Sequence, residues 1–310
     1  MNRRQFVKIA SGLSMGMVLP WKSRHTGFIS GRDTGDMLKK EIPSSGEMIP
    51  AVGMGTYITF NVGGDTGLRD DRTEVLQHFF DRGGGMIDSS PMYGSSEEVI
   101  GYGLQRTDNQ DNKFSATKIW TRRTGAGPSQ IEDSLDLWGI DQIDLMQVHN
   151  LLNQENHLET IREYKEEGKI RYVGLTTSHG RRHSELEQIM ENEPLDFVQL
   201  TYNVVDREPE ERLLPLAREK GIAIIANRPF QRGDLFDKFA HHPLPDWVEE
   251  IDVENWAQFF LKFIVSHSDI TCAIPATSKV EHMQENMGAL YGRFPDETQR
   301  SRMTDYIQTL

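Results

Sequence analysis

The chain has 310 residues, of which 37% are hydrophobic and 26% charged, and its formal net charge at pH 7 is −13. This composition is typical of a globular protein, and the negative charge argues against nucleic acid or an anionic membrane as a partner. The single cysteine, Cys272, excludes an internal disulfide framework and a cysteine-rich metal site.

The first 35 residues differ in kind from the rest. The run RRQF at residues 3–6 precedes a modest apolar stretch at residues 9–19, which is too short to span a bilayer comfortably. This order resembles a twin-arginine export signal; the alternative is a frayed basic arm. We expect residues 1–35 to be the export signal and linker of a bacterial, periplasmic protein. Because no Ala-x-Ala cleavage site is present, the alternative to cleavage is an uncleaved signal that tethers the protein.

Residues 36–310 are expected to form one folded domain without an integral membrane part. Its first segment, 37–49, reads as a β-hairpin around a Pro-Ser-Ser-Gly turn, and we expect it to close the bottom of the fold. Short apolar steps then recur along the chain, each a predicted strand. They cover residues 49–57, 84–90, 113–120, 142–150, 170–178, 195–203, 221–230 and 269–277.

Amphipathic segments separate these strands. Residues 72–84 carry apolar side chains at helical spacing and stop at glycines, and segments 128–140, 159–170 and 210–222 follow the same rule. Pro215 is expected to kink the last of them. Eight β-then-α units predict a (β/α)8 TIM barrel. The alternative, an open doubly wound sheet, would require a Gly-x-Gly-x-x-Gly turn after an early strand, which this chain lacks.

Polar residues stand at the ends of three successive strands. Asp88 ends the second predicted strand and Tyr93 lies in the turn after it, Lys118 ends the third strand, and His149 ends the fourth. Because the carboxyl ends of barrel strands converge on one mouth, we expect these four side chains to meet. Each alone has an ordinary structural explanation, such as a helix cap or core packing, but their joint occurrence indicates a catalytic site.

The four residue types suit proton transfer to a carbonyl oxygen. A tyrosine has an ordinary pKa near 10 and is a poor acid at neutral pH. A lysine ammonium within reach of the phenol is expected to lower that pKa, a carboxylate holds the lysine, and a histidine orients the substrate oxygen. The sequence therefore predicts that Tyr93 acts as general acid with support from Asp88, Lys118 and His149.

The motifs resemble those of the aldo/keto reductase superfamily over residues 37–289, most of the chain. The matching pieces are VGMGTY, MIDSSPMYG, ATKIW, DLMQVHN, RYVGLTTS, QLTYN and IPATSKVEHMQENMGA. The resemblance implies a (β/α)8 barrel with a nicotinamide cofactor across its mouth, NADP in preference to NAD, and a small carbonyl or alcohol substrate. It also implies that Tyr93 is the general acid, and by analogy a monomer.

The resemblance also implies cofactor contacts at five of the eight strand ends. Residues after strands five and six would hold the carboxamide, those after strand one would flank cofactor and substrate, and those after strand eight would meet the phosphate and adenine. Together these positions are Thr56, Tyr57, Thr176, Thr177, Gln199, Arg228, Thr277, Ser278, Lys279, His282, Glu285 and Asn286.

Four residues depart from the family pattern. Asn227 and Arg228 stand where many members stack an aromatic ring on the nicotinamide; Arg228 would stack instead, meet the diphosphate, or be a plain strand-end charge. His282 replaces an arginine that grips the 2′-phosphate, and Ala276 replaces a lysine, for which Lys279 would compensate. NADP is therefore expected, and NAD stays possible.

The substrate is the least specified part. Trp120, Met92 and Asn150 would line the pocket by position, and the insertion at residues 230–255 would cover it. No histidine and carboxylate cluster has metal-ligand spacing, so we expect no metal. An alternative to an enzyme is a nicotinamide-binding sensor or accessory subunit, although such a protein would not need all four polar residues.

Overall fold

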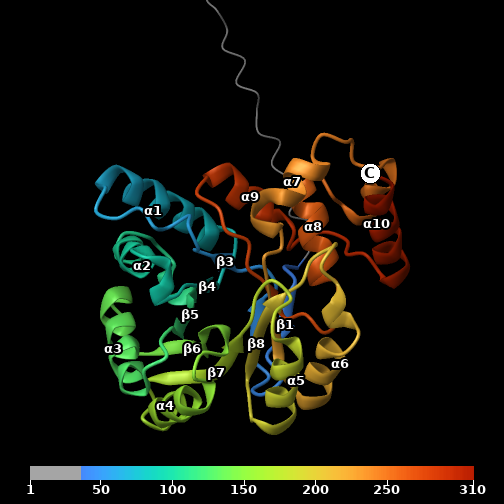
Figure 1. Ribbon diagram of the computed structural model, residues 1–310. Coiled ribbons are helices and arrows are strands. Elements are labelled where there is room, and N and C mark those ends of the chain that lie inside the picture. Colours follow the sequence, from blue (N-terminus) through green and yellow to red (C-terminus); the bar gives the residue numbers. More distant parts are fainter. Residues whose placement is uncertain (1–35) are drawn as a thin grey trace, which may run out of the picture. The chain divides into compact units, whose positions relative to one another are not determined.

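The computed structural model describes residues 36–310, so the predicted export signal at residues 1–35 lies outside the described part. Eight parallel strands form one sheet in which each strand pairs with its neighbours in the chain. Helices lie outside these strands (Figure 1). The strands are β3 (Met54–Gly55), β4 (Met86–Asp88), β5 (Phe114–Ile119), β6 (Ile143–Val148), β7 (Ile170–Thr176), β8 (Phe197–Thr201), β9 (Ala223–Asn227) and β10 (Cys272–Ala273).

One helix follows each strand from β3 to β8, two follow β9, and the last two follow β10 and end the chain. They are α1 (Thr66–Asp81), α2 (Ser96–Leu104), α3 (Gly127–Trp138), α4 (Gln154–Glu166), α5 (His183–Asn192), α6 (Leu213–Lys220), α7 (Asp234–Phe239), α8 (Trp256–Val265), α9 (Val280–Gly288) and α10 (Glu297–Thr309). None of the helices within residues 36–310 has the length and apolar character needed to cross a membrane. The prediction of a (β/α)8 barrel is confirmed.

Glycines allow the barrel to close where its first and last strands meet. The N–H of Gly53 donates to the carbonyl of Ala273 at 2.8 Å, and that of Gly55 donates to the carbonyl of Pro275 at 2.9 Å. A Cβ atom on Gly55 would lie 2.9 Å from the carbonyl oxygen of Ile274, so a side chain there would push the seam apart.

A hairpin covers the end of the barrel at which the strands begin. It consists of β1 (Lys39–Glu41) and β2 (Met48–Pro50), which pair antiparallel. Ile42, in its turn, is fully buried in one cluster with residues from the beginnings of the strands, among them Phe114 and Phe197. The hydroxyl of Tyr172 on β7 donates to Ser45 Oγ at 2.8 Å. The prediction of a hairpin that closes the bottom is confirmed.

Two local expectations are corrected. The predicted strand at residues 49–57 is divided, because β2 belongs to the hairpin and only β3 joins the barrel. Pro215 does not kink a helix, because α6 begins at Leu213 and places Pro215 in its first turn, where a backbone N–H has no partner to lose. The insertion at residues 230–255 contains α7 and the 3-10 helices η6 (Gln231–Gly233) and η7 (Asp246–Ile251).

Candidate active site

Three neighbouring strands bring the four predicted catalytic residues to the mouth of the barrel. Asp88 is the last residue of β4, and Tyr93 ends the 3-10 helix η1 (Pro91–Tyr93) directly after it. Lys118 lies one residue before the end of β5, and His149 begins the 3-10 helix η4 (His149–Leu151) after β6. Because β4, β5 and β6 are adjacent in the sheet, the side chains converge.

A buried ion pair forms the floor of this site. Lys118 Nζ donates to Asp88 Oδ2 at 2.6 Å and to the carbonyl oxygen of Ser89 at 2.7 Å, and both side chains are almost completely buried. Burial lowers the pKa of Lys118 below its ordinary value, and the charge of Asp88 opposes that shift. The pair therefore holds an ammonium group at a depth where a single lysine would lose its proton.

Two amides hold the other oxygen of the Asp88 carboxylate. Gln199 Nε2 donates to Asp88 Oδ1 at 2.8 Å and Gln147 Nε2 donates to it at 3.1 Å. Asn227 extends this network, since its amide nitrogen donates to Gln199 Oε1 at 3.4 Å and to the carbonyl of Thr177 at 2.8 Å. The sequence predicted Gln199 as a cofactor contact; in the structure its amide holds the carboxylate that pairs with Lys118.

The phenol of Tyr93 lies above the ion pair. Lys118 Nζ is 5.2 Å from the centre of its ring, and within residues 36–310 no group forms a hydrogen bond with its hydroxyl, which therefore stays available to a ligand. The predicted lowering of its pKa is wrong for this structure. Burial, followed by the charge of Asp88, raises the pKa of Tyr93 well above 10, because Asp88 neutralises the lysine charge that was expected to lower it.

His149 is buried beside the phenol as a neutral imidazole. Burial, followed by the charge of Lys118, lowers the pKa of His149 to about 3. Its Nδ1 lies 2.9 Å from Ser90 Oγ, which already accepts the N–H of Met92. We infer that the Ser90 hydroxyl donates its own proton to Nδ1, which leaves the ring proton on Nε2 as a donor for a substrate oxygen. Ser90 was not predicted from the sequence.

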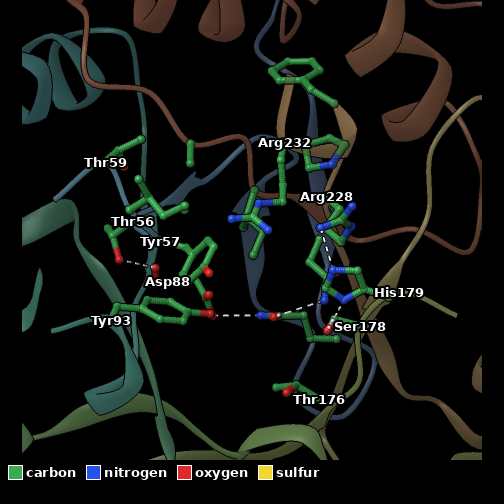
Figure 2. A pocket seen from close by; sticks show the side chains of 18 of the residues that line it. Thr56, Tyr57, Thr59, Asp88, Tyr93, Thr176, Ser178, His179, Arg228 and Arg232 are labelled. Carbon is green, nitrogen blue, oxygen red and sulfur yellow. Dashed lines mark hydrogen bonds between the residues drawn. The ribbon is translucent and has the colours of Figure 1, made fainter. Parts of the chain in front are cut away.

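A cavity of about 480 Å³ opens above these residues. Figure 2 shows Asp88 and Tyr93 on one side of it and Arg228 and His179 on the other. The cavity brings together most of the predicted site residues, and Lys118 lies beneath the cavity. The predicted residues that line it are Thr56, Tyr57, Asp88, Met92, Tyr93, His149, Asn150, Thr176, Thr177, Gln199 and Arg228.

Some predicted residues lie outside the cavity wall. Trp120 is 43% exposed. The Gln130 side chain accepts the backbone N–H of Trp120 at 2.7 Å and donates to its backbone carbonyl at 3.2 Å. In the insertion at residues 230–255, which was expected to cover the pocket, Phe236 lines the cavity, whereas Trp247 packs against Phe259. The predicted phosphate and adenine contacts also lie outside the wall, on α9 and the turn before it. They are Thr277, Ser278, Lys279, His282, Glu285 and Asn286.

The predicted carboxamide contacts fit a polar ligand group. Thr177 Oγ1 is buried and has no hydrogen-bond partner within residues 36–310, although Thr177 lines the cavity. Thr176 Oγ1 accepts the N–H of Asn150 at 3.0 Å, and Thr56 Oγ1 donates to the carbonyl of Asp88 at 2.9 Å. A buried hydroxyl without a partner is unfavourable, so Thr177 is suited to an amide that enters the cavity.

A group of polar side chains from the loops after β7 and β9 was only partly predicted. Arg228 Nη1 lies 2.8 Å from His179 Nε2, and the guanidinium of Arg232 lies 5.1 Å from the centre of the Tyr57 ring. His179 and Arg232 carry no sequence signal, because each is an ordinary polar residue in a loop. Within residues 36–310, no three histidine, cysteine or carboxylate side chains gather in a way that would hold a metal ion.

Residues 51–302 match the model of the aldo/keto reductase family. The chain is 28% identical over 267 residues to aldo-keto reductase str7 of Strobilurus tenacellus, covering 74% of this chain and 79% of that protein. It is 27% identical over 299 residues to aldo-keto reductase yakc [NADP(+)] of Schizosaccharomyces pombe, covering 81% and 87%. The crystal structure of an aldo-keto reductase from Klebsiella pneumoniae in complex with NADPH superposes with a TM-score of 0.72 at 23% identity, covering 87% and 95%.

Proposed function

This chain belongs to the aldo/keto reductase family, and we propose that it is an NADP-dependent oxidoreductase that reduces an aldehyde or ketone to an alcohol, or catalyses the reverse reaction. The observation that carries this proposal is the position of the Tyr93 hydroxyl in the cavity, above the buried Lys118–Asp88 pair and beside a neutral His149. The names of the relatives support the cofactor, since yakc is an NADP(+) enzyme and the Klebsiella protein binds NADPH.

In the proposed reaction Tyr93 supplies the proton. When bound, NADPH supplies a hydride to the carbonyl carbon. His149 Nε2 and the Tyr93 hydroxyl donate hydrogen bonds to the carbonyl oxygen, and Tyr93 transfers its proton to this oxygen as negative charge develops on it. The phenolate that remains is stabilised by the Lys118 ammonium. In the reverse direction, the same phenolate accepts the proton of the alcohol.

The cavity residues divide naturally between cofactor and substrate. Thr176, Thr177 and Gln199 provide polar groups that suit a nicotinamide carboxamide. Arg228 suits an anionic part of the nucleotide. Asn227 occupies the end of β9, where its amide is held by Thr177, so no aromatic ring stacks from that position. We propose a small-molecule carbonyl or alcohol as the substrate.

The decisive experiment compares wild type with Tyr93→Phe. Steady-state oxidation of NADPH with an aldehyde panel should fall by about 10²–10⁴-fold in the variant, while NADPH binding, followed by nicotinamide fluorescence, stays within about twofold. Wild-type protein that binds NADPH without turnover would support a sensor or accessory subunit instead. Equal turnover by both proteins would show that Tyr93 is not the acid.

We further propose that the chain is exported to the periplasm by the twin-arginine route, in a bacterium, with NADP already bound. The RRQF run at residues 3–6 supports this, and the route carries folded proteins. Substitution of both arginines by lysine should retain the protein in the cytoplasmic fraction. Purified exported protein should release nucleotide on denaturation, visible by its absorbance; an empty exported protein would contradict co-export.

A further inference from the structure

Unusual backbone conformations gather around the cavity. Eleven non-glycine residues within 36–310 have positive φ, and five of them line this cavity: Ile58, Asn150, His179, Arg228 and Arg232. L-residues avoid this region because Cβ approaches the backbone carbonyl oxygen, although asparagine and histidine tolerate it better than others. Such conformations persist where the surrounding structure imposes them, and they concentrate at functional sites.

Ile58 is the most unfavourable case. It is the one β-branched residue among the eleven, with φ of 66°, and a branched side chain at positive φ is a genuine outlier. Ile58 is 57% exposed and belongs to neither buried core cluster. Packing within the described part of the chain therefore does not account for an isoleucine at this position, where glycine or asparagine would fit the backbone with less strain.

The position of Ile58 gives its side chain a use. Ile58 lines the cavity directly after Tyr57, whose ring centre is 5.0 Å from that of Tyr93. Met92, also exposed and apolar, lines the same cavity from the loop that carries Tyr93. Apolar side chains thus line the cavity from the same two loops that carry Tyr57 and Tyr93, whereas Arg228 and His179 stand across the cavity from Tyr93 (Figure 2).

We propose that Ile58 is a specificity-determining residue that selects carbonyl substrates with a bulky apolar group, aromatic or alicyclic, on the carbonyl carbon. This inference rests on the proposed reductase function. A substrate whose oxygen meets Tyr93 has its body beside Tyr57, and the Ile58 side chain covers that body. The strained backbone holds the side chain over the cavity before substrate arrives, so contact requires no reordering of this loop.

The test compares two aldehydes in variants that separate strain from contact. Ile58→Gly relieves the backbone strain and removes the contact, and Ile58→Leu keeps an apolar side chain without β-branching. For 2-naphthaldehyde, kcat/KM should fall about tenfold in Ile58→Gly, since single methylenes in apolar pockets already change kcat/KM by about tenfold or more. For propanal it should change less than about twofold, and Ile58→Leu should retain the wild-type ratio.

Thermal unfolding distinguishes a specificity role of Ile58 from a structural one. The melting temperature of Ile58→Gly should stay level or rise, because relief of strain offsets the added freedom of the unfolded chain. Asn109→Gly, at φ of 62° outside the cavity, controls for backbone relief. Leu137→Ala, 42% exposed on α3, controls for loss of an exposed apolar side chain. Neither control should change the ratio of the two aldehydes.

The outcomes separate this inference from the function on which it rests. Wild-type protein that reduces neither aldehyde overturns the proposed function, and this inference with it. Wild-type protein that reduces both, with an unchanged ratio in Ile58→Gly, overturns the inference alone. An equal loss for both aldehydes together with a lower melting temperature in Ile58→Gly would mean that Ile58 is structural, and would overturn it as well.

Discussion

The Lys118–Asp88 pair offers a test in which stability and catalysis should separate. Asp88→Asn leaves an ammonium group buried without its carboxylate, and Lys118→Met leaves a buried carboxylate without its ammonium. Both side chains are almost completely buried, so solvent cannot compensate either loss. Removal of one partner of a buried pair typically destabilises a protein by about 3–5 kcal/mol. The double variant leaves no unpaired charge and should recover most of that stability.

These free energies translate into measurable shifts. An unfolding entropy of about 2.1 cal/mol/K per residue gives roughly 0.6 kcal/mol/K for a domain of this size. Each single variant should therefore lower the melting temperature by about 5–9 °C. Arg162→Met, which removes a half-exposed pair with Glu193, is the matched control and should change stability by less than about 1 kcal/mol.

The assay combines calorimetry with NADPH turnover on all four variants. The double variant should unfold near the wild-type temperature but stay as inactive as Lys118→Met, because no cation remains to stabilise the phenolate. A strictly additive double variant would show that the two charges are not coupled. Full activity in the stable double variant would refute the role of Lys118 beneath Tyr93.

Two further predictions concern His149 and Thr177. Folding lowers the pKa of His149 from its ordinary 6.5 to about 3, so the unfolded chain binds the proton first as the pH falls. The free energy of unfolding should therefore drop by about 1.4 kcal/mol per pH unit from about pH 6.5 towards pH 3. Chemical denaturation of His149→Gln should show a pH dependence without this contribution. Thr177→Val removes a hydroxyl that has no protein partner within residues 36–310. Fluorescence titration should show NADPH binding weakened by about five- to tenfold, whereas the unliganded protein should be at least as stable as wild type. Unchanged affinity for NADPH would exclude this hydroxyl as a contact.

The sequence predicted the barrel well because its signal is repeated eight times. Each buried strand of a parallel sheet is a short apolar run, and each run in this chain is followed by a polar turn and an amphipathic helix. Because Asp88, Lys118 and His149 stand at the carboxyl ends of those runs, their place at one mouth of the barrel could be predicted without any measured distance. The exception is the first strand, where Pro50, which has no N–H, ends the hairpin strand and only Met54 and Gly55 join the barrel.

The rest of the site depends on contacts that no local pattern encodes. Ser90 contacts His149 across 59 positions in the chain, and Gln147 reaches Asp88 from two strands away. The backbone conformation of Ile58 is also invisible in the sequence, because isoleucine gives no sign of positive φ. Trp120 shows the opposite failure, since its position at the end of β5 predicts a pocket residue whereas Gln130 holds its backbone outside the cavity wall.

The charge balance at Tyr93 shows why a list of residue types was insufficient. Tyrosine next to lysine predicts an acidified phenol, but the lysine charge is already matched by Asp88, and burial raises the pKa of Tyr93. The phenol is therefore protonated at rest, which is the form that a general acid needs. In the proposed reaction, the electrostatic benefit of Lys118 grows only as the phenol loses its proton, so it is stronger in the transition state than in the resting enzyme. Stabilisation of that kind increases kcat and not merely binding, and it requires Asp88 to keep Lys118 charged until then.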